Sequence, residues 1–116
     1  MHLSDLQREL KDLMQGIEHP RMGVALALAE ETGEVMRCVL DRECYGKDTL
    51  RELEGEVGDV LVALAELCER YGLSLERAGE GAVAKIRSKA PGWRAELGDR
   101  MARLRERMDG APPAAG

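Results

Sequence analysis

The spacing of hydrophobic and polar positions predicts helices along most of the chain. In the first segment the apolar residues recur every three or four positions, at Leu6, Leu10, Leu13, Met14 and Ile17. On a helix such residues share one face. Ser4, followed three positions later by Gln7, is a candidate capping box, so we expect a helix from Ser4 that ends at Glu18-His19-Pro20.

A second predicted helix, over residues 21–43, is apolar around more than half of its circumference. At 100° per residue, an arc from about 120° to about 320° holds Val24, Leu26, Leu28, Ala29, Val35, Met36, Val39 and Leu40. So wide an apolar surface indicates contact on more than one side, as in a bundle interior or an oligomer interface. The polar sector that remains carries Glu30, Glu31 and Glu34.

A third helix is predicted after a loop at residues 44–47, with Asp48 or Thr49 as its cap and Gly72 just beyond its end at Tyr71. Its apolar stripe consists of Leu50, Leu53, Val57, Val60, Leu61, Leu64 and Leu67. Two glycines, Gly55 and Gly58, lie inside it, at a cost of about 1 kcal/mol each relative to alanine. A close packing contact or a nearby ligand would account for them.

The last third of the chain predicts two further helices separated by a break. Ser74 caps a helix to about Ala90, Pro91-Gly92 interrupts it, a polar helix follows over residues 93–108, and residues 110–116 are expected to be disordered. We therefore expect one domain over residues 1–109.

Composition supports an all-α fold and excludes several function classes. The 116 residues are 44% hydrophobic and 34% charged, lack Phe and Asn, and are rich in the helix formers Ala, Leu, Glu and Arg. The net charge of −5 argues against a nucleic-acid binder. Three cysteines without a C-x-x-C pair indicate neither a disulfide framework nor a zinc site. With no membrane-length apolar run and no recognisable signal peptide, we expect a cytoplasmic protein without a membrane partner.

Two acidic pairs carry the candidate chemistry. Glu31 with Glu34, and Glu56 with Asp59, are each three residues apart, which places each pair on one helix face. Two such helices side by side would direct four carboxylates into a shared space, with Glu30 next to them. An all-oxygen cluster suits Mg²⁺ or Mn²⁺. Two such ions can clamp a phosphoanhydride and generate hydroxide from bound water, so hydrolysis of a di- or triphosphate is the natural reaction.

Two alternatives limit this interpretation. Glutamate is common on solvated helix faces, and because Glu52, Glu66 and Arg70 extend the stripe of Asp59, the third helix alone resembles an ordinary wet surface. A di-iron carboxylate bundle requires Glu-x-x-His on two helices. His2 and His19, the only histidines, do not follow an acid at that spacing, so the di-iron alternative fails.

The pattern E-E-x-x-E, a spacer of 21 residues (35–55) and E-x-x-D resembles the MazG-like all-α nucleoside triphosphate pyrophosphohydrolases. The likeness extends to Gly58-Asp59-Val60-Leu61 and to the basic segment Lys85-Ile86-Arg87-Ser88-Lys89-Ala90-Pro91. It implies a four-helix core, Mg²⁺ bound by acids of the two central helices, and release of pyrophosphate from a nucleotide.

Residue by residue, the resemblance implies metal ligands at Glu31, Glu34, Glu56 and Asp59. Glu30 would orient or deprotonate the attacking water, or else form a salt bridge. The expected phosphate-binding residues are Lys85, Arg87 and Lys89. The candidates for contact with the base are Trp93, Gln15 and His19. One departure is the Asn that many relatives carry near the phosphates: Val83 or Ile86 stands at the candidate positions, and the chain contains no Asn.

We therefore predict an Mg²⁺-dependent enzyme, with Mn²⁺ as a possible substitute, that converts an NTP or dNTP to the monophosphate and pyrophosphate and so cleans the nucleotide pool. Phosphoribosyl-ATP pyrophosphohydrolase is the alternative within this class, and a non-catalytic helical interaction module the alternative outside it. The broad apolar surface of the second helix predicts a homo-oligomer, with a tetramer favoured over a dimer.

Overall fold

The protein is described by a computed structural model, which covers residues 1–110. These residues form four α-helices and no strand: α1 (Leu3–Leu13), α2 (Arg21–Tyr45), α3 (Leu50–Tyr71) and α4 (Leu75–Asp109). The all-α prediction is confirmed. The chain divides into two compact units, Met1–Ala78 and a second that begins at Gly79, and each is described by itself. The predicted tail at 111–116 lies outside the described residues.

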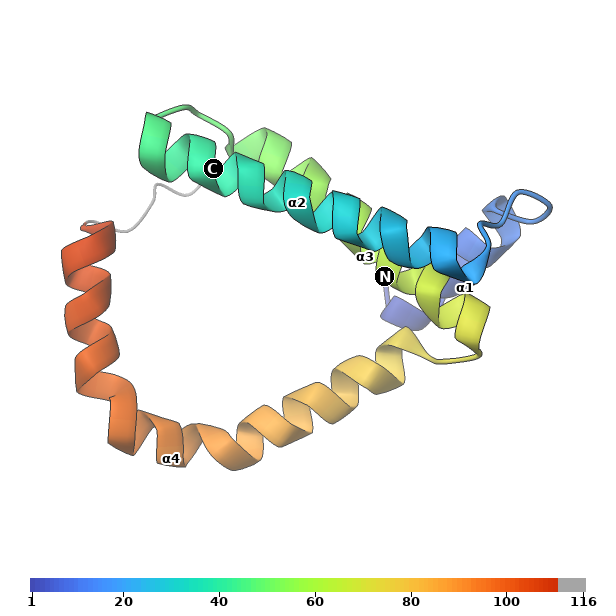
Figure 1. Ribbon diagram of the computed structural model, residues 1–116. Coiled ribbons are helices and arrows are strands. Elements are labelled where there is room, and N and C mark those ends of the chain that lie inside the picture. The colour runs from blue at the N-terminus through green and yellow to red at the C-terminus, as the bar shows by residue number, and fades with distance from the viewer. Residues whose placement is uncertain (111–116) are drawn as a thin grey trace. The chain divides into compact units, whose positions relative to one another are not determined.

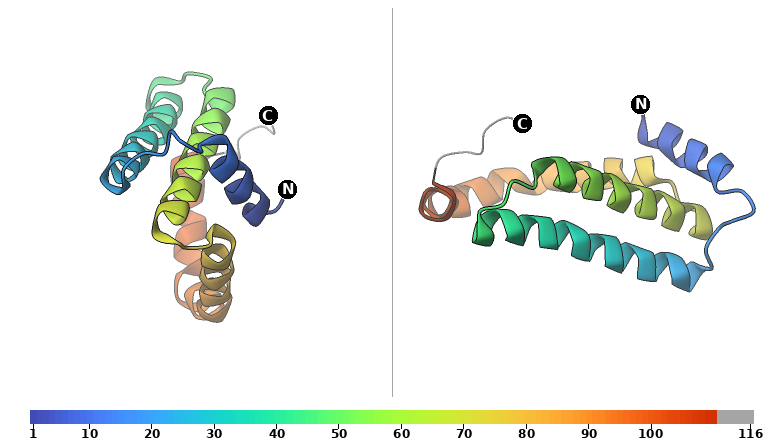
Figure 2. Two further views of the ribbon diagram at one scale, coloured as in Figure 1. Left: turned by 90° about the vertical axis from the view of Figure 1, so that its right-hand side faces the viewer. Right: turned by 90° about the horizontal axis from the view of Figure 1, so that it is seen from above.

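In the first unit, α2 and α3 lie side by side and run in opposite directions, and α1 packs against α3 (Figures 1 and 2). The turn between α2 and α3 starts at Gly46, whose φ of 66° is a left-handed conformation that glycine adopts without strain. Gly72 ends α3 in the same way, as expected. Because the turn is short, the acidic stretches of both helices come to the same part of the unit.

The hydrophobic core lies where α1, the end of α3 and the start of α4 meet. Its buried members are Ala65, Cys68 and Leu75, surrounded by the partly buried Leu3, Leu6, Leu10, Leu61 and Leu64. Gln7 is buried among them, and its side-chain amide donates hydrogen bonds to Glu69 Oε1 and the carbonyl of Leu73, both at 2.8 Å. Its Oε1 accepts a third, from the backbone N–H of Leu75. Gln7 thereby satisfies polar groups at the α3–α4 junction that would otherwise be buried without partners.

Both expected ends of the first helix were wrong, and so was the expected capping contact at the start of the third. The first helix starts at Leu3 and stops at Leu13, and Asp5 rather than Gln7 accepts the hydrogen bond of the capping residue, from the His2 N–H at 3.1 Å. Thr49 does occupy the cap position of α3, but its hydroxyl donates to the carbonyl of Cys38 on α2 at 2.8 Å. It therefore joins the two helices instead of capping one. The cap at Ser74 is confirmed, since its hydroxyl accepts from the Arg77 N–H at 3.1 Å.

The predicted break at Pro91-Gly92 is also wrong. The structure has one helix, Leu75–Asp109, that continues through Pro91, and Figure 1 shows its ribbon as continuous but sharply bent in its second half. Proline removes one backbone hydrogen bond and disfavours the α conformation of the preceding residue, and such a residue bends a helix more often than it ends one when the chain beyond it returns to helical geometry. As a result Lys85, Lys89 and Trp93 follow one another at intervals of four and lie on one face of α4.

The alternative interpretation of the third helix, an ordinary solvent-exposed face that includes Glu66 and Arg70, does not hold at Glu66. Glu66 is only 7% exposed, and its carboxylate contacts His19 Nδ1 at 3.0 and 3.1 Å and accepts from the His19 N–H at 3.2 Å. Arg70 Nε donates to the carbonyl of His19. These bonds fix the segment between α1 and α2 on α3, so that part of α3 is an internal polar junction.

Gly55 lies in the interior of α3, and a Cβ at this position would meet no atom within 4 Å. We expect Gly55→Ala to raise the free energy of unfolding by roughly 0.5–1 kcal/mol, because alanine loses less backbone entropy in a helix. Urea titration measures the change. Gly72→Ala is the control and should destabilise the fold, because Gly72 has a φ of 67°. Destabilisation by Gly55→Ala would show that another element approaches this point.

Candidate metal centre

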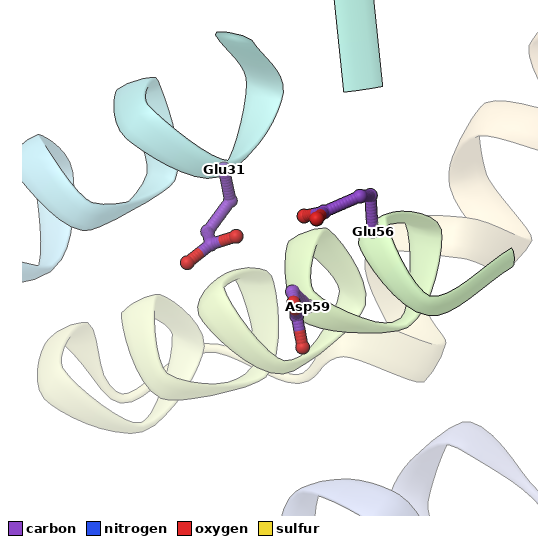
Figure 3. A group of neighbouring side chains, drawn as sticks. All are labelled: Glu31, Glu56 and Asp59. Atoms are coloured by element: carbon purple, nitrogen blue, oxygen red, sulfur yellow. The ribbon is translucent and has the colours of Figure 1, made fainter. Parts of the chain in front are cut away.

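Three carboxylates from α2 and α3 lie together in the first unit. One oxygen each of Glu31, Glu56 and Asp59 lies within 4.8 Å of the other two. Figure 3 shows Glu31 projecting from α2 toward α3, where Glu56 and Asp59 occupy successive turns. Glu31 and Glu56 are half-buried and Asp59 is exposed, so the group opens to solvent on one side.

Helix geometry brings this group together. The three-residue interval places Glu56 and Asp59 on one face of α3, and the antiparallel packing of α2 sets Glu31 opposite them. Beside these acids, Gly33, Gly55 and Gly58 have open space where a Cβ would be. The close packing contact that would have explained Gly55 and Gly58 is therefore not present in the described residues.

Burial and neighbouring negative charges both act on Glu31. Partial burial raises the pKa of Glu31 above its ordinary value, and the charges of Asp59, Glu56, Glu30 and Glu34 raise it further. A divalent cation would remove this repulsion. The donor set is made of carboxylate oxygens alone, which suits Mg²⁺ or Mn²⁺ better than zinc or copper. The residues present therefore fit a hard divalent cation.

The fourth expected ligand, Glu34, has a different partner. Its Oε2 accepts a hydrogen bond from Arg37 Nε at 3.0 Å. Glu34 remains close enough to contribute to the raised pKa of Glu31. The structure thus brings three of the four predicted ligands together and holds the fourth on an arginine. Sequence reasoning did not single out Arg37, although its position three residues after Glu34 was a usable signal.

Glu30 is exposed on α2, next to the group. Among the ion pairs within residues 1–110 none involves Glu30, so the alternative of a salt bridge has no partner there. Its role toward water stays a prediction.

The expected base-binding residues of the first unit lie near a cavity of about 410 Å³ between α1 and α3. Gln15 lines it, together with Leu10, Lys11, Glu18, Glu66 and Arg70. His19 contacts Glu66 on its wall. Glu66 follows Asp59 by seven residues, which on a helix is the same face about 10 Å farther along. The cavity therefore lies farther along α3 than the carboxylates, on the side toward its C-terminal end.

The expected phosphate-binding residues Lys85, Arg87 and Lys89, and Trp93 with them, lie on α4 in the second unit. Their roles at the carboxylates stay predictions.

Comparison with known families decides which fold and chemistry this arrangement belongs to. Residues 21–94, more than half of the chain, match the model of the MazG nucleotide pyrophosphohydrolase domain. The chain belongs to this family. The matched region of the MazG domain contains the carboxylate group and the basic segment of α4. Comparison with curated proteins and with solved structures gives no significant match. Within residues 1–110, no helix of the MazG domain has the length and apolar character of a membrane span.

The repulsion at Glu31 makes a pH-dependent prediction for the MazG domain. A carboxyl whose pKa is higher in the folded state than in the unfolded state lowers the stability of the fold when it is ionised. Below its ordinary pKa the group is protonated in both states and this destabilisation is absent. Above its folded-state pKa the group is ionised in both states and the destabilisation is complete. We expect Glu31→Gln, without added metal, to raise the melting temperature near neutral pH, and this gain to vanish at about pH 3–4. Thermal melts by circular dichroism in EDTA measure both. An equal gain at both pH values would mean that charge repulsion at Glu31 is not the cause.

Proposed function

We propose that this MazG domain hydrolyses a nucleoside triphosphate, NTP or dNTP, to the monophosphate and pyrophosphate with Mg²⁺, and that this removes surplus or non-standard nucleotides. The observation that carries the proposal is the convergence of Glu31, Glu56 and Asp59 from two helices within the MazG match. Acidic residues on ordinary solvent-exposed helix faces have no reason to converge with acidic residues of a second helix.

The reaction needs water, an activated phosphorus and a neutralised leaving group. Mg²⁺ held by Glu31, Glu56 and Asp59, with Glu34 as the expected fourth ligand, would supply positive charge at the phosphate oxygens. Glu30, exposed beside these carboxylates, is suited to orient a water and accept its proton. Attack on the α-phosphorus forms one P–O bond and breaks the bond to the bridging oxygen, which leaves with pyrophosphate.

The chain offers candidate residues for contact with the phosphates and with the base of the substrate. Lys85 and Lys89, one helical turn apart on α4, could neutralise the departing phosphates, with Arg87 near them in sequence. The cavity with Gln15 on its wall, about 10 Å along α3 from Asp59, has room for a nucleobase. Trp93 and His19 are the other base-binding candidates.

The decisive experiment is a nucleotide panel. The full chain is incubated with each NTP, dNTP and phosphoribosyl-ATP, with Mg²⁺, Mn²⁺ or EDTA, and pyrophosphate is measured. We expect release from at least one NTP or dNTP, none in EDTA, and a loss of at least about 100-fold in kcat/KM for Asp59→Asn, with the fold retained by circular dichroism.

The alternatives give different results in the same panel. Turnover confined to phosphoribosyl-ATP would identify the biosynthetic alternative. No metal-dependent turnover, together with no rise in melting temperature on adding Mg²⁺ and nucleotides, would identify a non-catalytic module. Full activity of Asp59→Asn would contradict the metal site.

We also propose that the MazG domain forms a homo-oligomer, with a tetramer favoured over a dimer. The support is the apolar side of α2 that the first unit leaves uncovered, with Met22 74%, Leu26 66% and Met36 54% exposed. Isolated exposed hydrophobics are ordinary, but a contiguous row on one helix marks an interaction surface.

Light scattering tests the assembly. We expect a mass of several chains at micromolar concentration, and a shift to smaller species for Leu26→Lys, because a buried charge without a partner opposes association. Leu13→Lys on α1, where Leu13 is 77% exposed, is the matched control and should leave the mass unchanged. A stable monomer of the unaltered chain would contradict the proposal.

A further inference from the structure

Arg37 is the cation that lies nearest in sequence to the expected ligands of α2, and its guanidinium binds three carboxylates at once. Nε donates to Glu34 at 3.0 Å and one terminal nitrogen donates to Asp41 at 3.2 Å, both on α2. The other terminal nitrogen donates to Glu52 across on α3. The planar fork of arginine suits this arrangement because its donors point in several fixed directions.

The contacts of Arg37 differ in what they do. Asp41 and Glu52 anchor the guanidinium from two helices, and neither belongs to the carboxylate group of Glu31, Glu56 and Asp59. Glu34 is the one partner that is also an expected metal ligand. Its Oε2 accepts a charge-assisted hydrogen bond from Arg37 Nε, and this bond weakens the attraction between that oxygen and a cation. Arg37 therefore divides the acidic residues into three that meet and one that is held back.

We propose that Arg37 is a positioning residue that competes with the divalent cation for Glu34 and so limits the affinity of the site. When a cation takes Glu34, the anchors on Asp41 and Glu52 keep the guanidinium beside the site, ready to take Glu34 back. The inference rests on the proposed metal-dependent function and adds a residue that tunes it.

A purely structural role for Arg37 is a poorer account of these contacts. Its side chain is 45% exposed, and ion pairs in such positions contribute little to stability. Arg42 offers a comparison on the same helix: it pairs with Asp48, which is not an expected ligand. It lies eleven residues from Glu31, about 16 Å along the helix axis, against about 9 Å for Arg37.

Mn²⁺ binding tests the proposal without relying on turnover. The electron paramagnetic resonance signal of free Mn²⁺ is followed as the full chain is titrated. We expect Arg37→Gln to tighten Mn²⁺ binding by about three- to tenfold, since a competing ion pair is removed and Glu34 is released. Arg42→Gln removes the same unit of charge and should change the affinity by less than about twofold, because more distant exposed charges are screened.

A double-mutant cycle shows whether Arg37 acts through Glu34. In a Glu34→Gln background, Arg37→Gln should have no larger effect than Arg42→Gln, because the group for which arginine competes is gone. Arg37→Lys keeps the charge but cannot reach three carboxylates at once, so it should tighten binding by an intermediate factor. It also serves as the test variant if Arg37→Gln does not fold.

The outcomes separate this inference from the proposed function. If the unaltered chain binds Mn²⁺ but Arg37→Gln leaves the affinity unchanged or weakens it, the inference is overturned while the metal site stands. An equal gain for Arg42→Gln, or an undiminished gain in the Glu34→Gln background, also overturns it. No Mn²⁺ binding by the unaltered chain overturns both.

Discussion

Repulsion between carboxylates is the constraint on which this MazG domain depends. The antiparallel packing of α2 and α3 brings Glu31, Glu56 and Asp59 into one space, where burial first and the neighbouring negative charges next raise the pKa of Glu31. A chain selected for stability alone would place some of these side chains apart or neutralise them. Their convergence is the feature of this structure that supports the proposed divalent cation.

The rest of the first unit holds the two helices in register against that repulsion. Thr49 binds the carbonyl of Cys38 and Arg37 binds Glu52, so polar contacts join α2 to α3 near their connecting turn. At the other end, Glu66 holds His19 and thereby the start of α2. The acidic group lies between these junctions, so the two helices cannot separate without breaking contacts at one end or the other, and the Thr49–Cys38 hydrogen bond among them is buried.

Regular periodicity was predictable from the sequence, and so was the carboxylate spacing. The stripe of α3, the cap at Ser74 and the left-handed Gly72 all follow from local rules that need no tertiary information. Two of the errors have a common cause. Glu66 and Gln7 are polar residues whose burial depends on partners 47 residues away or more, and no local pattern identifies those partners. At Pro91 a local rule was applied too strictly, because a proline inside a helix can bend it without ending it.

The predictions for the candidate site also differ according to whether they depend on local spacing or on a partner from another part of the chain. Glu31, Glu56 and Asp59 could be predicted because two short-range intervals and one helix pairing suffice to bring them together. The fate of Glu34 could not, because it depends on Arg37, whose orientation is set by Asp41 on its own helix and by Glu52 on α3. A sequence motif specifies which side chains can reach a cation, whereas neighbouring counter-charges decide how freely they do so. If Arg37 competes for Glu34 as proposed, we expect the metal affinity of this acidic motif to depend on the counter-charges beside it as well as on the four carboxylates.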